Sequence, residues 1–382
     1  MEYEVPFDSE VGGLKINFTP WFDSDYRFTL LHLYEELGGE IASGHMELEL
    51  AKSEKALKLL DTQKTGTLTI TGSTVTPAIL DIYVYIYHID YDNEHKVTMD
   101  FVCEKVEGDE NFYYKKKKSI YTSIDDIVHN IYPGVIEIRT ETDIQEKDPK
   151  YWQNDVTDHD FLTRFAYAWK KDSVFGYSWD RFFIKDTKGK LDSHGNEEVK
   201  LWIHGDKYNS DMIQLEPYYN KYKPDLYNVP IDIWNNKEIA KKDYSKWEAV
   251  NPKVMYKFGE LTAFHNSYYQ FHYNIEYNRA YMNSDIFQGI KLICHHIPEY
   301  RLGDVVEYKK DYNKQPDPIK WNFKYYLVKS NELFIALDGS NAVDEYGAKF
   351  TWTSKLLGIE EDGSIALGKE TDDKGHSNPK AE

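Results

Sequence analysis

The chain has 382 residues, enough for two or three domains, and 41% of them are hydrophobic, as in globular proteins. Its formal net charge of −19 argues against a general DNA-binding role, because affinity for nucleic acid comes mainly from lysine and arginine side chains that neutralise phosphates. Tyrosine is abundant, with 32 copies, and this side chain favours strands and interfaces because it joins a large apolar body to a polar tip. This composition suits an assembly protein or a glycan-binding protein.

The sequence shows no feature of secretion or of a disulfide framework. Residues 1–4 are acidic and lack the basic and apolar regions of a signal peptide. The most apolar run, 78–89, contains Asp81 and is too short to cross a bilayer. The two cysteines, Cys103 and Cys294, lie far apart in the chain. We therefore expect a protein without a membrane anchor that is made and used without secretion.

The first 118 residues are expected to form a β-barrel, because short alternating runs are separated by turn signals. The expected strands are 46–50, 67–71, 82–89 and 97–106, and the last two should pair across the turn at Asp92-Asn93. Two helices are also expected, over 24–37 with Ser24 as its cap and over 53–60.

The strand 82–89 is apolar on one side and aromatic on the other. Ile82, Val84 and Ile86 alternate with a second set of side chains, namely Tyr83, Tyr85 and Tyr87. Neither face is polar, so the strand is either buried on both faces or has one face in a protein interface. The three tyrosines are therefore our candidate subunit interface.

Residues 119–198 read as a mixed α/β segment. Ser123 and Asp126 form a capping-box pattern for a helix over 123–131, which Pro133-Gly134 ends, and a strand follows at 136–139.

A second helix is expected to begin at Thr157, whose hydroxyl can accept from the free N–H groups of the first turn. Asp158 and Asp160 suit the positive end of its dipole. Its apolar face comprises Phe161, Leu162, Phe165, Ala166 and Trp169. After Gly176 a buried aromatic strand is expected over 179–184, closed by the charged pair Lys185-Asp186.

Residues 199–272 are rich in tyrosine and proline and show little periodicity. We expect a long, mostly irregular insertion with one short helix near 237–247, and loops of this length are usually functional or interfacial. The tyrosines at 218, 219, 222 and 227 motivate an alternative function as a glycan-binding tail module, because glycan binders stack sugars on exposed aromatic rings.

Strands resume in 273–366, which is expected to form a second β-barrel. Residues 290–297 lead into the turn Leu302-Gly303-Asp304, which is followed by strands near 325–330 and 350–353. The polar segment 367–382 is expected to be disordered.

These patterns, in this order, resemble the central baseplate hub proteins of phage tails and the similar N-terminal part of VgrG spike proteins. The residues that carry the resemblance are Gln153, Asp158, Asp160, Phe161, Leu162 and Arg164, followed by Gly303 and Asp304. The helix over 123–131 also has its counterpart in that family. The family's more usual Glu-Ser-Asp before the helix is Val156-Thr157-Asp158 here, so the first acidic position is absent.

The resemblance implies a mainly β, α+β fold with two tube-like β-barrels joined by an α/β element. It also implies a structural role in the virion tail, as a homotrimer that contacts tail tube proteins and a central spike, with genomic DNA only in transit. Such a hub is not an enzyme. A tail-associated cell-wall hydrolase remains a further alternative, since 65 acidic residues provide many possible carboxylate pairs.

No catalytic, cofactor-binding or metal-binding residues are predicted. Cys294 and His296 can share one face of a strand, but no second ligand cluster accompanies them. Residues 90–94 begin like a calcium loop without its glycine or its final acid, so they are expected to form a hairpin turn. The lysine run 115–118 is interpreted as a solvated hairpin edge or a patch facing an acidic neighbour.

Overall fold

The computed structural model describes about half of the chain, and every statement below concerns these residues. They are 2–4, 15–19, 26–50, 64–72, 79–92, 96–103, 112, 115–121, 124–131, 136–139, 151–168, 173–186, 199–204, 212–219, 229–232, 237–238, 262–265, 288–294, 296–298, 300–309, 323, 325–336, 342–344 and 349–359. The helix expected over 53–60 and the tail 367–382 lie outside them.

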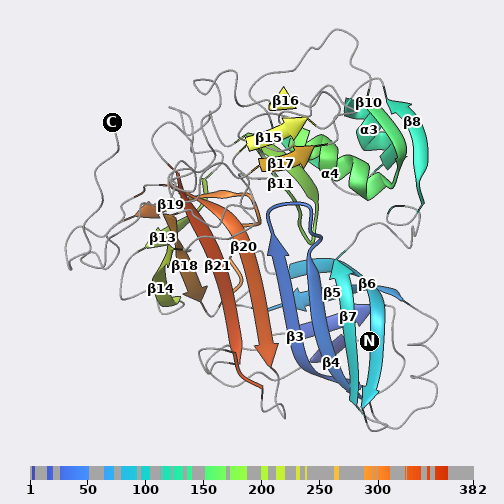
Figure 1. Ribbon diagram of the computed structural model, residues 1–382. Coiled ribbons are helices and arrows are strands. Elements are labelled where there is room, and N and C mark those ends of the chain that lie inside the picture. Colours follow the sequence, from blue (N-terminus) through green and yellow to red (C-terminus); the bar gives the residue numbers. More distant parts are fainter. Residues whose placement is uncertain are drawn as a thin grey trace.

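One 13-stranded sheet dominates the molecule (Figure 1). Its N-terminal strands are β1 (Glu2–Glu4), β2 (Lys15–Thr19), β3 (Tyr26–Glu36), β4 (Ser43–Leu50), β5 (Thr65–Thr71), β6 (Ile79–Asp92) and β7 (Lys96–Cys103). Its C-terminal strands are β13 (Val199–His204), β14 (Met212–Tyr219), β18 (Gln288–Cys294), β19 (Val305–Lys309), β20 (Tyr325–Ala336) and β21 (Phe350–Ile359). The order is β1-β2-β5-β6-β7-β4-β3-β20-β21-β18-β14, and β19 pairs with β20 and β13. The mainly β class is confirmed.

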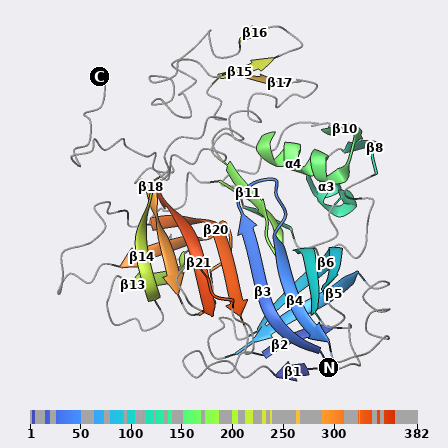
Figure 2. The same cartoon turned by 60° about the horizontal axis from the view of Figure 1, so that its bottom comes forward.

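The two groups of strands meet where β3 pairs antiparallel with β20, with Leu33 opposite Leu333 (Figure 2). At this seam both strands bury alternate apolar side chains, namely Leu31 and Leu33 of β3 and Leu333 and Ile335 of β20, so one face of each belongs to the core there. The sequence predicted two barrels but not this pairing, because the partners lie about 300 residues apart in the chain.

The helix expected over 24–37 is wrong, because Tyr26–Glu36 within this range forms β3. Leu31, Leu33 and Glu35 are buried while His32 and Tyr34 are only half-buried, which is a period of two. The leucines in this stretch also match helical spacing, but β4 and β20 provide hydrogen-bonding partners on both edges. Tertiary pairing therefore overrides the local pattern.

The insertion at 199–272 is less irregular than expected. Its residues supply β13 and β14 to the large sheet, and β15 (Val229–Asp232), β16 (Lys237–Glu238) and β17 (Thr262–His265) form a small separate sheet. The helix expected near 237–247 is contradicted where it should begin, because 237–238 is a strand; residues 239–247 lie outside the described part. These strands pair with distant partners, which a local pattern does not reveal.

The described residues of 117–186 form a connecting element of strands and two helices, drawn in teal to green in Figure 1. It comprises β8 (Lys117–Tyr121), α3 (Ile124–Ile131), β9 (Ile136–Arg139), β10 (Tyr151–Val156), α4 (Asp158–Ala168), β11 (Ser173–Tyr177) and β12 (Phe182–Asp186). β8 pairs with β10, and β12 lies between β11 and β9. The helix expected over 123–131 and the strand at 136–139 are confirmed.

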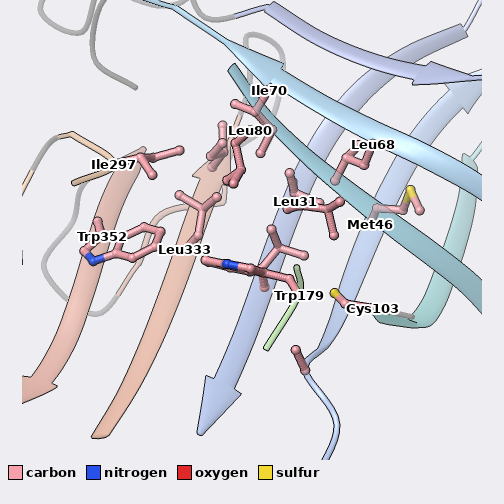
Figure 3. Close-up of a cluster of buried hydrophobic side chains, with 14 of the residues drawn as sticks. Leu31, Met46, Leu68, Ile70, Leu80, Cys103, Trp179, Ile297, Leu333 and Trp352 are labelled. Atoms are coloured by element: carbon pink, nitrogen blue, oxygen red, sulfur yellow. The ribbon is translucent and has the colours of Figure 1, made fainter. Parts of the chain in front are cut away.

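Two buried clusters hold these parts together. The larger cluster spans both groups of strands and includes Trp179 of the connecting element. The ring centroids of Trp179 and Trp352 of β21 lie 5.4 Å apart (Figure 3). The smaller lies inside the connecting element, between its helices and strands. Trp179 was expected in a strand, but it lies in the turn between β11 and β12, and Gly176 lies within β11.

None of the helices in the described part of the chain is long and apolar enough to cross a membrane.

Candidate functional site

The motif residues Gln153 and Asp158 form a buried polar cluster where β8, β10 and α4 meet. Tyr121 donates its hydroxyl hydrogen to Gln153 Oε1 at 2.7 Å. Gln153 Nε2 donates to Asp158 Oδ1 at 2.8 Å, and Lys117 Nζ forms an ion pair with the other carboxylate oxygen. A glutamine is required here because its amide oxygen must accept from Tyr121 while its amide nitrogen must donate to Asp158.

This cluster fixes the start of α4. Asp160 N–H donates to Thr157 Oγ1 at 3.1 Å, which confirms the predicted N-cap. Phe161 and Leu162 are buried in the connecting element, as their helical spacing predicted. Asp160 itself is exposed, and the side chain of Arg164 lies outside the described residues. In the lysine run 115–118, Lys117 forms the ion pair with Asp158. The side chains of Lys115, Lys116 and Lys118 are exposed.

The motif residues Gly303 and Asp304 contact the connecting element directly. Asp304 Oδ1 accepts from Lys185 Nζ at 3.0 Å and from Arg181 at 3.3 Å, and its other oxygen accepts from Arg301 N–H at 2.9 Å. The Asp304 side chain is only 2% exposed. Lys185, near the end of β12, and the Gly303-Asp304 turn before β19 therefore form one buried polar site.

Gly303 is required by both conformation and space. Its φ of 76° lies in the left-handed region, which favours glycine. A Cβ atom at this position would overlap the ring of Phe183 on β12. That ring also lies beneath the cations of Lys185 and Arg181, at 5.4 and 5.8 Å from its centroid. The backbone of the turn therefore packs directly against the Phe183 ring of β12.

A third polar site surrounds Glu35 of β3. Its carboxylate accepts from Ser178 Oγ at 2.6 Å and from Asn331 Nδ2 at 2.6 Å. Asn331 Oδ1 in turn accepts from Ser354 Oγ at 2.7 Å. Ser354 Oγ accepts from Trp352 Nε1 and lies 2.7 Å from the Tyr300 hydroxyl. This chain of hydrogen bonds links β3, the β11–β12 turn, β20 and β21.

Glu35 is completely buried, and burial raises the pKa of its carboxyl to about 7. The hydrogen bonds from Ser178 and Asn331 lower the pKa, but they do not offset the loss of hydration. Asp180 raises the pKa further and Arg301 lowers it. The carboxyl is thus poised between its neutral and ionised forms near neutral pH.

The loop between β3 and β4 rests on the connecting element. Gly38 N–H donates to Phe175 O at 2.8 Å, and Ala42 N–H donates to Tyr177 O at 3.0 Å. His159 Nε2 of α4 lies 3.1 Å from Gly39 O, and burial lowers the pKa of this imidazole. Neutral histidine is therefore favoured here, with its proton on Nε2. Together with the Glu35 and Asp304 sites, these bonds form a joint between the N-terminal strands, the connecting element and the C-terminal strands.

The family resemblance had marked Gln153 and Asp304 as motif residues, without their contacts, whereas no motif marked Glu35. One signal was present: Leu31, Leu33 and Glu35 are spaced by two, which places the glutamate on the inward face of a strand. Interpreting 24–37 as a helix concealed it.

The candidate interface tyrosines lie on the outward face of β6. Tyr87 is 60% exposed and Tyr83 is 38% exposed, whereas Tyr85 is half-buried. The alternate residues Ile82, Val84 and Ile86 are buried, which confirms the side-chain alternation. That these tyrosines contact another subunit remains a prediction.

Cys294 and His296, the pair considered as metal ligands, lie at the end of β18 and just after it. Cys294 is buried in β18 and its thiol lies 3.4 Å from the carbonyl oxygen of His296. Across the described ranges, no group of three or more His, Cys, Asp or Glu side chains is arranged to hold a metal ion. Residues 90–92 lie at the end of β6, where Asp92 pairs with Lys96 of β7.

No protein-family model matches this chain, and no curated protein matches it. Solved structures do. The 43 kDa tail protein of prophage MuSo2 from Shewanella oneidensis is similar over 92% of this chain and 99% of its own, with a TM-score of 0.52 and 10% identity. The tail protein from Neisseria meningitidis MC58 is similar over 90% of this chain and 96% of its own, with a TM-score of 0.50 and 7% identity.

A chain of the half-lidded Francisella PdpA-VgrG complex is similar over 94% of this chain, with a TM-score of 0.51 and 12% identity. This protein spans 59% of that longer chain. At these identities the comparisons define the fold alone. It is the fold of phage tail proteins, shared with a chain of a VgrG-containing complex, as the motif residues predicted.

Proposed function

We propose that this protein is a structural component of a phage tail or a related injection device, and that it serves as the trimeric hub of the baseplate. The observation that carries the proposal is the joint. One buried site there brings together two segments that resemble hub motifs. They are Gly303-Asp304 of the C-terminal part and Lys185 of the connecting element. The fold of tail proteins supports the same role.

The physical logic of a hub is symmetry matching. A tail tube has sixfold symmetry, whereas a central spike has threefold symmetry. Three copies of a chain with two barrel-like units present six such units to the tube while keeping a threefold axis for the spike. In this protein the two groups of strands are joined through β3 and β20, so each chain can supply two units held in a fixed relation. The domains 1–118, 119–198, 199–272 and 273–366 belong to this proposal.

The proposed partners are a second and third copy, tail tube proteins and a central spike. The similarity to a chain of a PdpA-VgrG complex supports a spike partner. We place the contact between copies at the outward face of β6, because Tyr83 and Tyr87 expose large aromatic rings there. The location is the virion tail, assembled in the host cytoplasm.

The net charge of −19 fits a conduit for DNA. An acidic or neutral bore does not neutralise phosphates, so DNA slides through it without being held. In this proposal the protein has no enzymatic activity, and DNA is a passing cargo rather than a ligand.

The test is the mass of the native particle, measured by light scattering or native mass spectrometry, followed by averaged electron microscopy images. We expect a trimeric ring, alone or after addition of the cognate spike protein. A monomer both alone and with the spike would refute the hub. Glycan arrays and zymograms on host peptidoglycan test the two alternative functions, and we expect both to be negative.

A further inference from the structure

We propose that Glu35 is a proton-controlled latch, which closes the joint when its carboxyl is neutral and loosens it when ionised. The proposal concerns the joint itself and does not depend on the hub assignment.

The geometry places one carboxyl in contact with all three parts of the joint. Glu35 belongs to β3 of the N-terminal strands, Ser178 to the turn of the connecting element, and Asn331 to β20 of the C-terminal strands. Trp179 N–H also points at the carboxylate, at 3.4 Å. A change in the charge of this group therefore acts on all three parts at once.

Within the described part of the chain, two nearby cations bind other groups. The Arg301 guanidinium donates to the carbonyl oxygens of Pro298 and Tyr300, and Lys329 Nζ lies 3.3 Å from the carboxylate of Glu36. Asp180 adds a negative charge nearby, and on β7 the buried thiol of Cys103 faces the same region. An ionised Glu35 is thus held by hydrogen bonds from neutral donors and by the attraction of Arg301, and together these compensate the cost of burial incompletely.

Protonation also changes the hydrogen-bond pattern. When Glu35 is ionised, Ser178 and Asn331 both donate to it. When it is neutral, one of its oxygens carries a proton and can donate to Ser178 Oγ, while the other still accepts from Asn331. The neutral form therefore keeps the contacts to the connecting element and to β20 without a buried charge.

Cys103 provides the readout. It belongs to the same buried cluster as Trp179, the residue that follows Ser178 (Figure 3). Its N–H donates to Ala42 O, and Ala42 N–H donates to Tyr177 O, so an opening of the joint exposes this thiol. In a Cys294→Ala background, Cys103 is the single thiol in the chain.

The experiment measures the rate at which 5,5′-dithiobis(2-nitrobenzoate) labels Cys103 in the native protein between pH 6 and pH 8. At each pH, the labelling rate of the protein with Glu35 intact is divided by the rate of the Glu35→Gln variant. This division cancels the intrinsic pH dependence of the thiol. Opening that hydrates Glu35 becomes more favourable as the pH rises, so we expect this ratio to increase on the order of 10-fold over the range. A Glu40→Gln variant, which changes an exposed carboxyl in the same connection, should keep the wild-type increase.

A second variant keeps the test decisive if Glu35→Gln does not fold. The Ser178 hydrogen bond lowers the pKa of Glu35. Ser178→Ala should therefore move the rise in labelling to higher pH, a shift that a purely structural role of Ser178 does not produce. A flat ratio for Glu35→Gln, or a rise for Ser178→Ala at unchanged or lower pH, would overturn the proposal.

Discussion

Asp304 and Lys185, which lie 119 positions apart in the chain, form an ion pair of 3.0 Å in which both side chains are largely buried. One belongs to the turn before β19 and the other to the end of β12. The contact attaches the C-terminal strands to the connecting element, and it leads to the first of five predictions.

Asp304→Asn should destabilise the protein by about 2–4 kcal/mol, because it leaves two buried cations facing a neutral amide. The measurement is urea unfolding followed by tryptophan fluorescence. Asp81→Asn, which changes an exposed carboxyl on β6, is the control and should cost less than about 1 kcal/mol. Equal losses in the two variants would contradict the assigned role of Asp304.

Gly303→Ala should cost about 2–4 kcal/mol, from the left-handed backbone and the overlap of a Cβ with Phe183. In a Phe183→Leu background the overlap is relieved but the backbone cost stays. The same substitution should then cost less. A double-mutant cycle by chemical denaturation measures the difference, and strict additivity would exclude the steric part.

Gln153→Leu should cost about 2–4 kcal/mol, because Tyr121 and Asp158 both lose a buried partner. Tyr121→Phe is the matched comparison, since it removes the hydroxyl bonded to Gln153 but keeps the bond between Gln153 and Asp158, and it should cost about 1 kcal/mol. Thermal unfolding by calorimetry gives both values. If the smaller change proved as costly as the larger, the bond to Asp158 would not be the dominant contribution.

Replacing Tyr83 and Tyr87 together by serine should weaken association of the chains about 100-fold or more, because exposed aromatic anchors contribute most at interfaces. The stability of the isolated chain should change little. Ile120→Ser is the control, because Ile120 is 58% exposed on β8, away from β6. Sedimentation equilibrium reports the association, and unchanged association of the double variant would remove β6 from the interface.

The stability of the wild type relative to Glu35→Gln should depend on pH in a definite direction. The pKa of Glu35 is about 7 in the folded protein and near 4.5 in the unfolded chain, so the folded state binds this proton more tightly. The resulting stabilisation is complete below pH 4.5 and is lost as the pH rises through 7, a change of about 3 kcal/mol. Unfolding at a series of pH values measures it. A difference between the two proteins that grows in the opposite direction would contradict the assignment.

The sequence by itself determined the local elements whose signals are short-range. Thr157 capped its helix as predicted, and the alternation around Ile82 and Tyr83 placed one side of β6 inside and the other outside. Gln153, Asp158 and Gly303-Asp304 could be selected because a family resemblance marked them.

The tertiary structure alone decided how distant segments meet. It paired β3 with β20 and joined Asp304 to Lys185. It also turned Glu35 inward against Ser178 and Asn331, 143 and 296 residues away. The physical reason is that strand pairing and charge burial depend on partners supplied by the rest of the fold, whereas caps, turns and side-chain periodicity depend on a residue's own neighbours.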